Sequence, residues 1–482
     1  MAVRAAALPV RLRGGRAPGG PALLLAAAVA VVGVAGLSTA FAVPLVGAVA
    51  FGLLVVAFAR LPHVMAAVLV VFLSTQPLLR DFVSPSFGPA KDVIVIAAVF
   101  AAVWWLVFGE VERRRIDAWL LAGIAVVLAV YVINPAGSHD AAWFHATRLV
   151  LEAFLLLVVG LSTPDPRRTW RWTLVALGVS AAGIAIWGLV QQQIGLYGLV
   201  NLGYGYDQQV RLTAGGSFRS FGTFDDPFNY AAFLAIALTS VVLARRRPAL
   251  VALLVPLLVA GIAVSFVRTS LAFLPVLLML ALLQRRRTIS LVAVLAAMLA
   301  AVVLFLAVSP PDPPSRVGTG RADVIITLNG RTEGWTKILD TPRAAIAGRG
   351  VGDLGTGRAR ADAAALAAPT NQPSQQTAAE HQRYNIDSSY FALAADVGVV
   401  GLLLVLAVFA RIVTLGLRIV GRGRTEGWVV IGLVLEMAVD SLTRTSLTSF
   451  PVGFIGLFVL GAALAAGLAE RPGLSPRTRG PG

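Results

Sequence analysis

The chain has no cysteine, only four histidines and few charged side chains in its 482 residues. The absence of cysteine excludes disulfide bonds, thiol chemistry and cysteine-ligated metal sites, and it suits a surface that faces an oxidising compartment. The histidines show no HExxH or comparable metal-ligand spacing. Charged residues make up 13% of the chain and apolar residues 57%, with a mean hydropathy of +0.81. This composition excludes a soluble domain of such length and indicates a membrane protein with many spans.

Fourteen apolar segments approach the length that a membrane-spanning helix needs, which is roughly 20 residues or somewhat fewer when neighbouring helices support it. Their approximate limits are 22–37, 41–59, 63–79, 92–108, 118–134, 146–162, 172–190, 228–244, 249–266, 269–284, 288–308, 390–411, 427–443 and 447–469. We therefore expect an all-α fold, a polytopic transmembrane helix bundle of 12–14 spans with one long extracytoplasmic loop that contains short helices.

The distribution of basic residues predicts which ends of the helices face the cytoplasm. With the N-terminus inside, 24 of the 40 basic residues fall in cytoplasmic segments, 7 in short outside segments and 9 in the long loop. Since short cytoplasmic loops retain Lys and Arg, this excess predicts a multi-pass protein of the cytoplasmic (inner) membrane with the long loop outside. The Arg clusters occur one per cytoplasmic turn, which argues against a surface for nucleic acid.

The spans divide the chain into four parts. We expect about eleven spans in residues 1–308, the long extracytoplasmic loop at 309–388, about three spans in 389–470 and a cytoplasmic tail at 471–482. The first span resembles a cleavable signal peptide that ends in Ala-Phe-Ala. A second span follows at once, so we favour an uncleaved anchor.

Two outside segments are too long to be simple turns, and long segments of this kind are usually functional or disordered. The first is Gln191–Asp226, rich in Gly, Tyr and Gln, and the second is the long loop. Within that loop, residues 331–339 are expected to form a short helix that stops before Pro342. Its Trp335 favours the membrane interface, whereas the Ala, Gln, Pro and Thr bias of residues 358–382 predicts a flexible linker.

Arginines at the predicted outside ends of the spans are candidates for binding phosphate. Arg211 and Arg219 precede the eighth span, Arg268 lies at the tight junction of the ninth and tenth, and Arg331 opens the loop helix. A guanidinium group presents a rigid fork that matches phosphate oxygens. Arg268 could instead extend to lipid headgroups, and Arg331 could be a solvated helix end. The GRGVG sequence at 348–352 is either an anion-binding backbone or a simple tight turn.

Carboxylates near the outside ends are candidates for acid or base roles. Asp387, just before the twelfth span, could act as a general base or as the N-cap of that helix. Glu436 and Asp440, four residues apart in the thirteenth span, are expected to share a helical face that points into the bundle. Asp225 and Asp226 resemble a metal-binding pair, yet without a third carboxylate a loop or N-cap role is favoured.

Three stretches carry a family resemblance. The first is SFRSFGTFDDPF at 217–228, and the second is SFVRTSLAF at 265–273. The third is the text of the long loop, with Arg331 and Trp335, GRGVG, and the closing IDSSYF and GVVG. Together they resemble the O-antigen ligase and O-antigen polymerase family of bacterial membrane glycosyltransferases. The resemblance covers roughly residues 190–420, and each of its motifs is short.

The resemblance implies a type C-like glycosyltransferase that takes a glycan from undecaprenyl pyrophosphate at the outer face of the membrane. The acceptor would be a hydroxyl on a lipid or on a growing glycan, and neither a metal nor another cofactor would take part. Arg219, Arg268 and Arg331 would hold the pyrophosphate. The family's His-Asn pair is replaced here by Asp387-Ser388, which leaves Asp387 or the nearby His381 to assist the acceptor.

A second function class stays open, because a flippase or exporter of lipid-linked glycans would also be polytopic with charges inside the bundle. Transporters commonly place polar groups at the bilayer midplane and contain a repeated half. Here the candidate charges gather at the outside ends and no repeat is evident, which favours the transferase. A third possibility is a non-catalytic component of a polysaccharide assembly. The expected partners are the lipid-linked donor, a glycan or lipid-glycan acceptor and membrane lipids.

Overall fold

A computed structural model describes residues 39–84, 87–109, 111, 116–134, 139–205, 210–212, 218–244, 248–285, 341–354, 388–447 and 449–469. The helices within these ranges are α2 (Thr39–Arg60), α3 (Pro62–Phe82), α4 (Phe87–Val107), α5 (Ala118–Ile133), α6 (Ala141–Leu161), α7 (Pro166–Asn201), α8 (Pro227–Ala244), α9 (Pro248–Val264), α10 (Arg268–Arg285), α14 (Pro342–Ala347), α17 (Ser389–Gly421), α18 (Thr425–Ser441) and α19 (Val452–Leu468). Residues up to Val56 form one compact unit and those from Ala57 onward form another, and the arrangements described below concern the second.

Twelve of the fourteen predicted spans coincide with helices, and the other two, 22–37 and 288–308, lie outside the described residues. Six helices are long and apolar enough to cross a membrane: α3, α4, α6, α7, α8 and α17. Shorter apolar stretches of 10–17 residues lie in α2 (residues 47–60), α5, α9, α10 and α19. The prediction of an all-α polytopic bundle is confirmed at this level. The exact number of spans stays a prediction.

Aspartates start several helices, which explains where these begin. Asp117, Asp140 and Asp165 each accept a hydrogen bond from a backbone N–H in the first turn of α5, α6 and α7. At the start of α8 the Asp226 carboxylate accepts a hydrogen bond from the backbone N–H of Asn229 at 2.7 Å, and the side-chain amide of Asn229 donates a second one to it. The favoured reading of Asp226 as an N-cap is confirmed.

The core of the described bundle is α19, whose residues 452–467 are all buried. An apolar helix without a polar face is expected to be surrounded by other helices. Gly160 of α6 and Gly461 of α19 allow these two helices to touch, since a Cβ at Gly160 would lie 2.6 Å from the carbonyl oxygen of Phe458. Small residues at such crossings let two backbones approach closely.

The helix α7 is longer than predicted, and this corrects one boundary. Residues 191–201 were expected to leave the helix as an outside segment, but α7 continues to Asn201. The prediction treated residues 191–226, rich in Gly, Tyr and Gln, as one loop segment, whereas Gln191 and Gln192 form hydrogen bonds within the bundle. The helix is interrupted at Gly195 (φ 71°), a backbone conformation that glycine adopts without strain. A similar interruption occurs in α17 at Gly398 (φ 73°).

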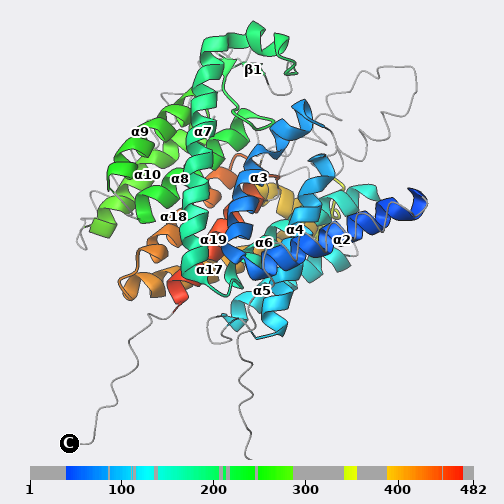
Figure 1. Cartoon of the computed structure of the whole chain (residues 1–482). Helices are drawn as coiled ribbons and strands as arrows, with labels where there is room; N and C mark the ends of the chain where they lie inside the picture. The colour runs from blue at the N-terminus through cyan, green and yellow to red at the C-terminus, as the bar shows by residue number, and fades with distance from the viewer. Residues whose placement is uncertain are drawn as a thin grey trace, which may run out of the picture. The chain divides into compact units, whose positions relative to one another are not determined.

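One end of the bundle brings together the starts of α8 and α10 with the ends of α3 and α18. The charge pattern predicts that this end faces outward, and we call it the predicted outer end. The helix α7 runs beside α8 and α9 (Figure 1). Between α7 and α8 the chain forms two short antiparallel strands, β1 (Arg211–Leu212) and β2 (Phe218–Arg219). Arg211 and Arg219 are partners across this pair.

Candidate functional site

The guanidinium group of Arg444, three residues past the end of α18, joins three helix ends. Its Nη2 lies 2.7 Å from the carboxylate of Asp440, 3.0 Å from the hydroxyl of Thr269 and 3.3 Å from that of Ser270. Its Nη1 donates to the carbonyl oxygen of Phe228. Arg444 is only 9% exposed. The side chain therefore orders the start of α8, the start of α10 and the end of α18 around itself.

The backbone of Arg444 is held by the start of α17. Both the N–H and the hydroxyl of Ser389 donate to the Arg444 carbonyl oxygen, at 2.7 and 2.8 Å. The hydroxyl of Ser388 donates to the carbonyl oxygen of Ser441 at 2.9 Å. Both serines belong to the NIDSSYF sequence and are buried. Ser388 and Ser389 of this motif are thus fastened to the same helix ends.

Two guanidinium groups contact a single aromatic ring at this end. The Cζ atoms of Arg219 and Arg444 lie 4.9 and 5.1 Å from the ring centroid of Phe228. A ring face attracts cations, so Phe228 partly offsets the repulsion between the two arginines. We call Arg219, Phe228, Thr269, Asp440 and Arg444 the arginine cluster. An anion with several oxygens is the kind of group that such a cluster would bind.

The junction between α9 and α10 carries backbone strain. Phe266 has φ 52°, the one positive φ among the described non-glycine residues, and such a conformation costs on the order of 1–3 kcal/mol. The strand β2 holds the junction in place: Arg219 Nη2 donates to the carbonyl oxygen of Phe266 at 2.9 Å, and the N–H of Ser220 donates to that of Val264 at 3.0 Å. Strain held by several contacts is typical of functional sites, and Arg268 follows directly as the first residue of α10.

Two glutamines of α7 hold the segment that contains Arg219. The Gln191 side chain accepts from the N–H groups of Phe221 and Gly222 at 3.1 and 2.9 Å and donates to the carbonyl oxygen of Gly222. Gln192 Nε2 donates to the Ser220 hydroxyl at 2.7 Å. Polar side chains inside an apolar helix are costly unless they have partners. These contacts therefore explain why glutamines occur here and show that they position β2.

The structure brings some of the predicted phosphate-binding residues together. Arg219 lies in the arginine cluster, and Arg268 begins the helix whose next residue, Thr269, belongs to it. Arg211 is the cross-strand partner of Arg219 in the β1–β2 pair. The remaining predicted site residues, Arg331, His381 and Asp387, lie outside the described residues.

Sequence reasoning did not assign a role to Arg444, which it counted only as one of seven basic residues in short outside segments. A signal was available, because Asp440 and Arg444 are four residues apart and could pair across one helical turn. The expectation that Glu436 and Asp440 point into the bundle is confirmed, since each is 3% exposed. The partners Thr269 and Ser270, about 175 positions earlier, could not be inferred from spacing.

A second group of charges lies beneath the same end, between α4 and α6. Lys91 Nζ donates to Asp92 and lies 3.3 Å from Glu152, while Arg148 lies 3.0 Å from Asp92 and 3.8 Å from Glu152. The Lys91 ammonium is also 5.1 Å from the ring centroid of Phe450. We call Lys91, Asp92, Arg148 and Glu152 the ion network. Two cations and two anions compensate each other within it.

The two remaining predicted features have structural roles. In GRGVG, Gly348 and Gly352 have φ of 80° and 79°, and a Cβ on Gly348 would lie 2.6 Å from the backbone of Asp396. The N–H of Gly352 donates to the Asp396 carboxylate at 3.2 Å, so the motif is a turn packed on α17. Asp225 pairs with Arg80 at 2.8 Å. Burial raises the pKa of the Asp225 carboxyl, and the Arg80 charge opposes that rise.

No group of three or more His, Asp or Glu side chains suited to a metal ion occurs within the part of the chain that the structure describes. The arginine cluster and the neighbouring Arg268 place several guanidinium groups at one end of an apolar bundle. Comparison with known protein families finds no match for this chain, and comparison with curated proteins finds none either.

Proposed function

We propose that the protein is a membrane glycosyltransferase that moves a glycan from a polyprenyl pyrophosphate to a hydroxyl acceptor in cell-envelope or exopolysaccharide synthesis. The resemblance to O-antigen ligases and polymerases suggests this reaction. The observation that supports it best is the contact of Arg219 and Arg444 with one ring, beside the start of α10 at Arg268. Several guanidinium groups at the end of an apolar bundle suit a ligand that joins a lipid chain to two phosphates.

In the proposed reaction the acceptor oxygen attacks the anomeric carbon of the donor sugar. The bond from that carbon to the pyrophosphate oxygen breaks, and the polyprenyl pyrophosphate leaves with the bonding electrons. Fixed arginines would stabilise the negative charge that develops on the leaving group. The acceptor proton passes to a base, for which Asp387 and His381 remain the proposed residues. Ligase and polymerase share this chemistry and differ in the acceptor.

The interruptions in α7 and α17 bear on the alternative of a flippase or exporter, because transporters often contain broken helices near the bilayer midplane. Residues 166–194 of α7 extend roughly 44 Å before the break at Gly195, more than the roughly 30 Å of a hydrocarbon core. In α17 the break at Gly398 comes nine residues after the helix begins at Ser389. The break in α7 therefore lies toward the predicted outer end, which favours a transferase acting at the membrane surface. Nine residues of α17 rise roughly 14 Å, about half of the hydrocarbon core, so the break at Gly398 does not distinguish the two functions.

Reconstituted protein with a radiolabelled polyprenyl-pyrophosphate oligosaccharide tests the proposal. We expect label to move to an acceptor or to grow in length, and Arg219→Ala, Arg268→Ala and Asp387→Ala each to reduce transfer about 100-fold or more. Arg268→Lys should restore only part of the activity, because it keeps the charge but loses the fork. The control is Arg422→Ala, which removes an exposed charge at the other end of α17.

Two results would contradict the proposal. If label changes leaflet without changing its covalent attachment, the protein is a flippase. If the three alanine variants keep the transfer activity of the unaltered protein, the arginine cluster and Asp387 are not the site of the reaction.

A further inference from the structure

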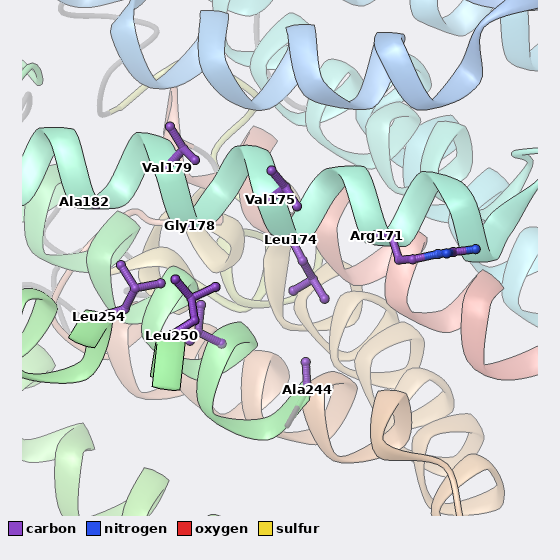
Figure 2. Close-up of a pocket in the computed structure, with 10 residues that line it drawn as sticks. Arg171, Leu174, Val175, Gly178, Val179, Ala182, Ala244, Leu250 and Leu254 are labelled. Atoms are coloured by element: carbon purple, nitrogen blue, oxygen red, sulfur yellow. The ribbon is translucent and has the colours of Figure 1, made fainter. Parts of the chain in front are cut away.

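A lateral groove lies between α7, α8 and α9, at the end of the bundle opposite the arginine cluster. Its volume is about 550 Å³. The lining residues are Arg171, Leu174, Val175, Gly178, Val179, Ala182, Val241, Ala244, Leu250 and Leu254. All except the first are apolar. In Figure 2 Leu174 of α7 points to the side where Leu250 and Leu254 lie, whereas Val175 and Val179 lie on the other side of the α7 ribbon.

The sequence of α7 explains the hollow. Leu174, Gly178 and Ala182 are spaced by four residues and therefore lie on one helical face. The last two have small side chains, so the space that larger residues would fill stays open. Val175 and Val179 on the rim are 58% and 68% exposed, whereas Leu254 on the floor is 7% exposed. The groove therefore opens sideways, toward the surface that a membrane helix presents to lipid.

The length of the groove along α7 matches the thickness of one membrane leaflet. Arg171 lies in the second turn of α7, Ala244 is the last residue of α8 and Leu250 lies in the first turn of α9, so the groove begins where these helices meet the surface. From Arg171 to Ala182 the helix rises roughly 16 Å. Half of a typical hydrocarbon core is about 15 Å. An acyl chain of one leaflet would thus lie along its full length.

A positive charge stands at the mouth of the groove. Figure 2 shows the Arg171 side chain extending along α7, past the apolar lining and away from Leu250 and Leu254. Within the described residues its guanidinium group donates one hydrogen bond, from Nε to the carbonyl oxygen of Arg167 at 3.4 Å. An apolar channel with a cation at its surface end has the polarity of a phospholipid, whose chains are apolar and whose phosphate is anionic.

From these observations we propose that the groove is a binding site for a membrane phospholipid with an anionic headgroup. One acyl chain lies between α7 and α9, and the phosphate contacts Arg171. This site is separate from the arginine cluster and does not depend on the proposed transfer reaction. The binding involves no covalent step.

Native mass spectrometry of the purified full-length protein tests the proposal. Delipidated protein is titrated with phosphatidylglycerol and with phosphatidylcholine of the same acyl chains. We expect one phosphatidylglycerol to be retained with about tenfold preference over phosphatidylcholine, the factor that a charge-assisted contact of about 1.4 kcal/mol supplies. Arg171→Gln should remove the preference. Gly178→Leu should remove binding of both lipids, since the new side chain fills the groove.

Two matched controls are available on the same helix. Arg168→Gln removes an exposed arginine that does not line the groove, and Gly183→Leu adds the same bulk at a position where a Cβ would meet nothing within 4 Å. Both should bind lipid as the unaltered protein does. Because Gly178 has only the Leu254 side chain nearby, at 3.6 Å, the test variant should fold as its control does.

Three outcomes would overturn the proposal. The first is binding that survives Gly178→Leu, which would reduce the site to a charge on the surface. The second is a loss of binding in Gly178→Leu with no change of preference in Arg171→Gln. The third is stronger retention of a polyprenyl phosphate than of phosphatidylglycerol in a competition, which would make the groove a site for the lipid carrier.

Discussion

The arginine cluster and the ion network lie toward the same end of the bundle, yet they are built from different partners. In the ion network each cation lies near both carboxylates, so the charges balance between α4 and α6. In the arginine cluster three of the four acceptors around Arg444 are neutral, namely a carbonyl oxygen and two hydroxyls. The fourth acceptor is the Asp440 carboxylate, so the arginine cluster holds two guanidinium groups and one carboxylate, whereas the ion network holds two cations and two carboxylates. The network is therefore suited to joining helices, and the cluster to attracting an anion.

The arginine cluster and the ion network also differ in the kind of backbone that carries their side chains. The ion network joins side chains from the regular turns of two helices. The arginine cluster joins helix ends, a strand and the strained junction at Phe266. Helix ends and strained turns can present side chains to a ligand, whereas residues in the middle of packed helices face one another. A charge buried in an apolar bundle is thus informative about function only together with its partners.

The largest expected effect comes from breaking the ion network. Glu152→Ala leaves Lys91, which is buried, with one carboxylate instead of two, and the loss of one hydrogen-bond partner of a buried charged group costs about 1–3 kcal/mol. We expect the free energy of unfolding in detergent to fall by this amount, measured by denaturant titration. Glycan transfer per folded molecule should not change. The control is the double variant Lys91→Met/Glu152→Leu, which removes both charges and should be much less destabilised.

The opposite result would erase the contrast between the two groups. If Glu152→Ala kept its stability but lost transfer, the ion network would belong to the reaction site.

A smaller effect is expected from the ring between the two arginines. Phe228→Leu keeps an apolar side chain but removes the face that both guanidinium groups contact, and each such contact is worth about 0.5–2 kcal/mol. We expect transfer to fall about tenfold in the reconstituted assay, with little change in unfolding temperature. Phe224→Leu is the matched control, because Phe224 packs against Phe233 in the same region. Equal losses in the two variants would assign the effect to packing alone.

Much of this fold could be predicted because apolar runs and their caps are local. The limits of most helices follow from the length of the apolar segments, and the Asp-Pro-x-x start of α8 follows from capping chemistry. Local patterns failed at the end of α7, where Gln191 and Gln192 looked like the beginning of a loop. Their partners are 26 to 72 residues away, so only the packed structure shows that the helix continues.

The candidate site could be predicted in part. The cost of a charge at the end of an apolar span was enough to select Arg219 and Arg268. It could not select Arg444, since the same criterion applies to every arginine at that end, and what distinguishes Arg444 is the meeting of α8, α10, α17 and α18 around it. Which helix ends meet depends on packing between distant segments, and hydrophobic periodicity carries no information about it.

The smallest effect is expected for an ion pair that belongs to neither the ion network nor the arginine cluster, and this pair serves as a reference for both. At the start of α5, both carboxylate oxygens of Asp117 accept hydrogen bonds from Arg411, at 3.0 and 2.5 Å. This contact lowers the pKa of the Asp117 carboxyl below its ordinary value of 3.8. Asp117→Asn removes the charge but keeps a good helix N-cap. Because the pair is partly exposed, we expect a loss of about 1 kcal/mol at neutral pH.

The pH dependence of this difference follows from the direction of the pKa shift. A carboxyl whose pKa is lowered in the folded protein stabilises it above the ordinary pKa, and this contribution is lost as the pH falls through the lowered value. Unfolding curves of the unaltered protein and Asp117→Asn should therefore differ at pH 7, begin to converge only below the ordinary value of 3.8, and coincide below the lowered pKa. A difference that persists at low pH would show that Asp117 acts through capping or packing, and the pair could then no longer serve as the reference for a partly exposed charge.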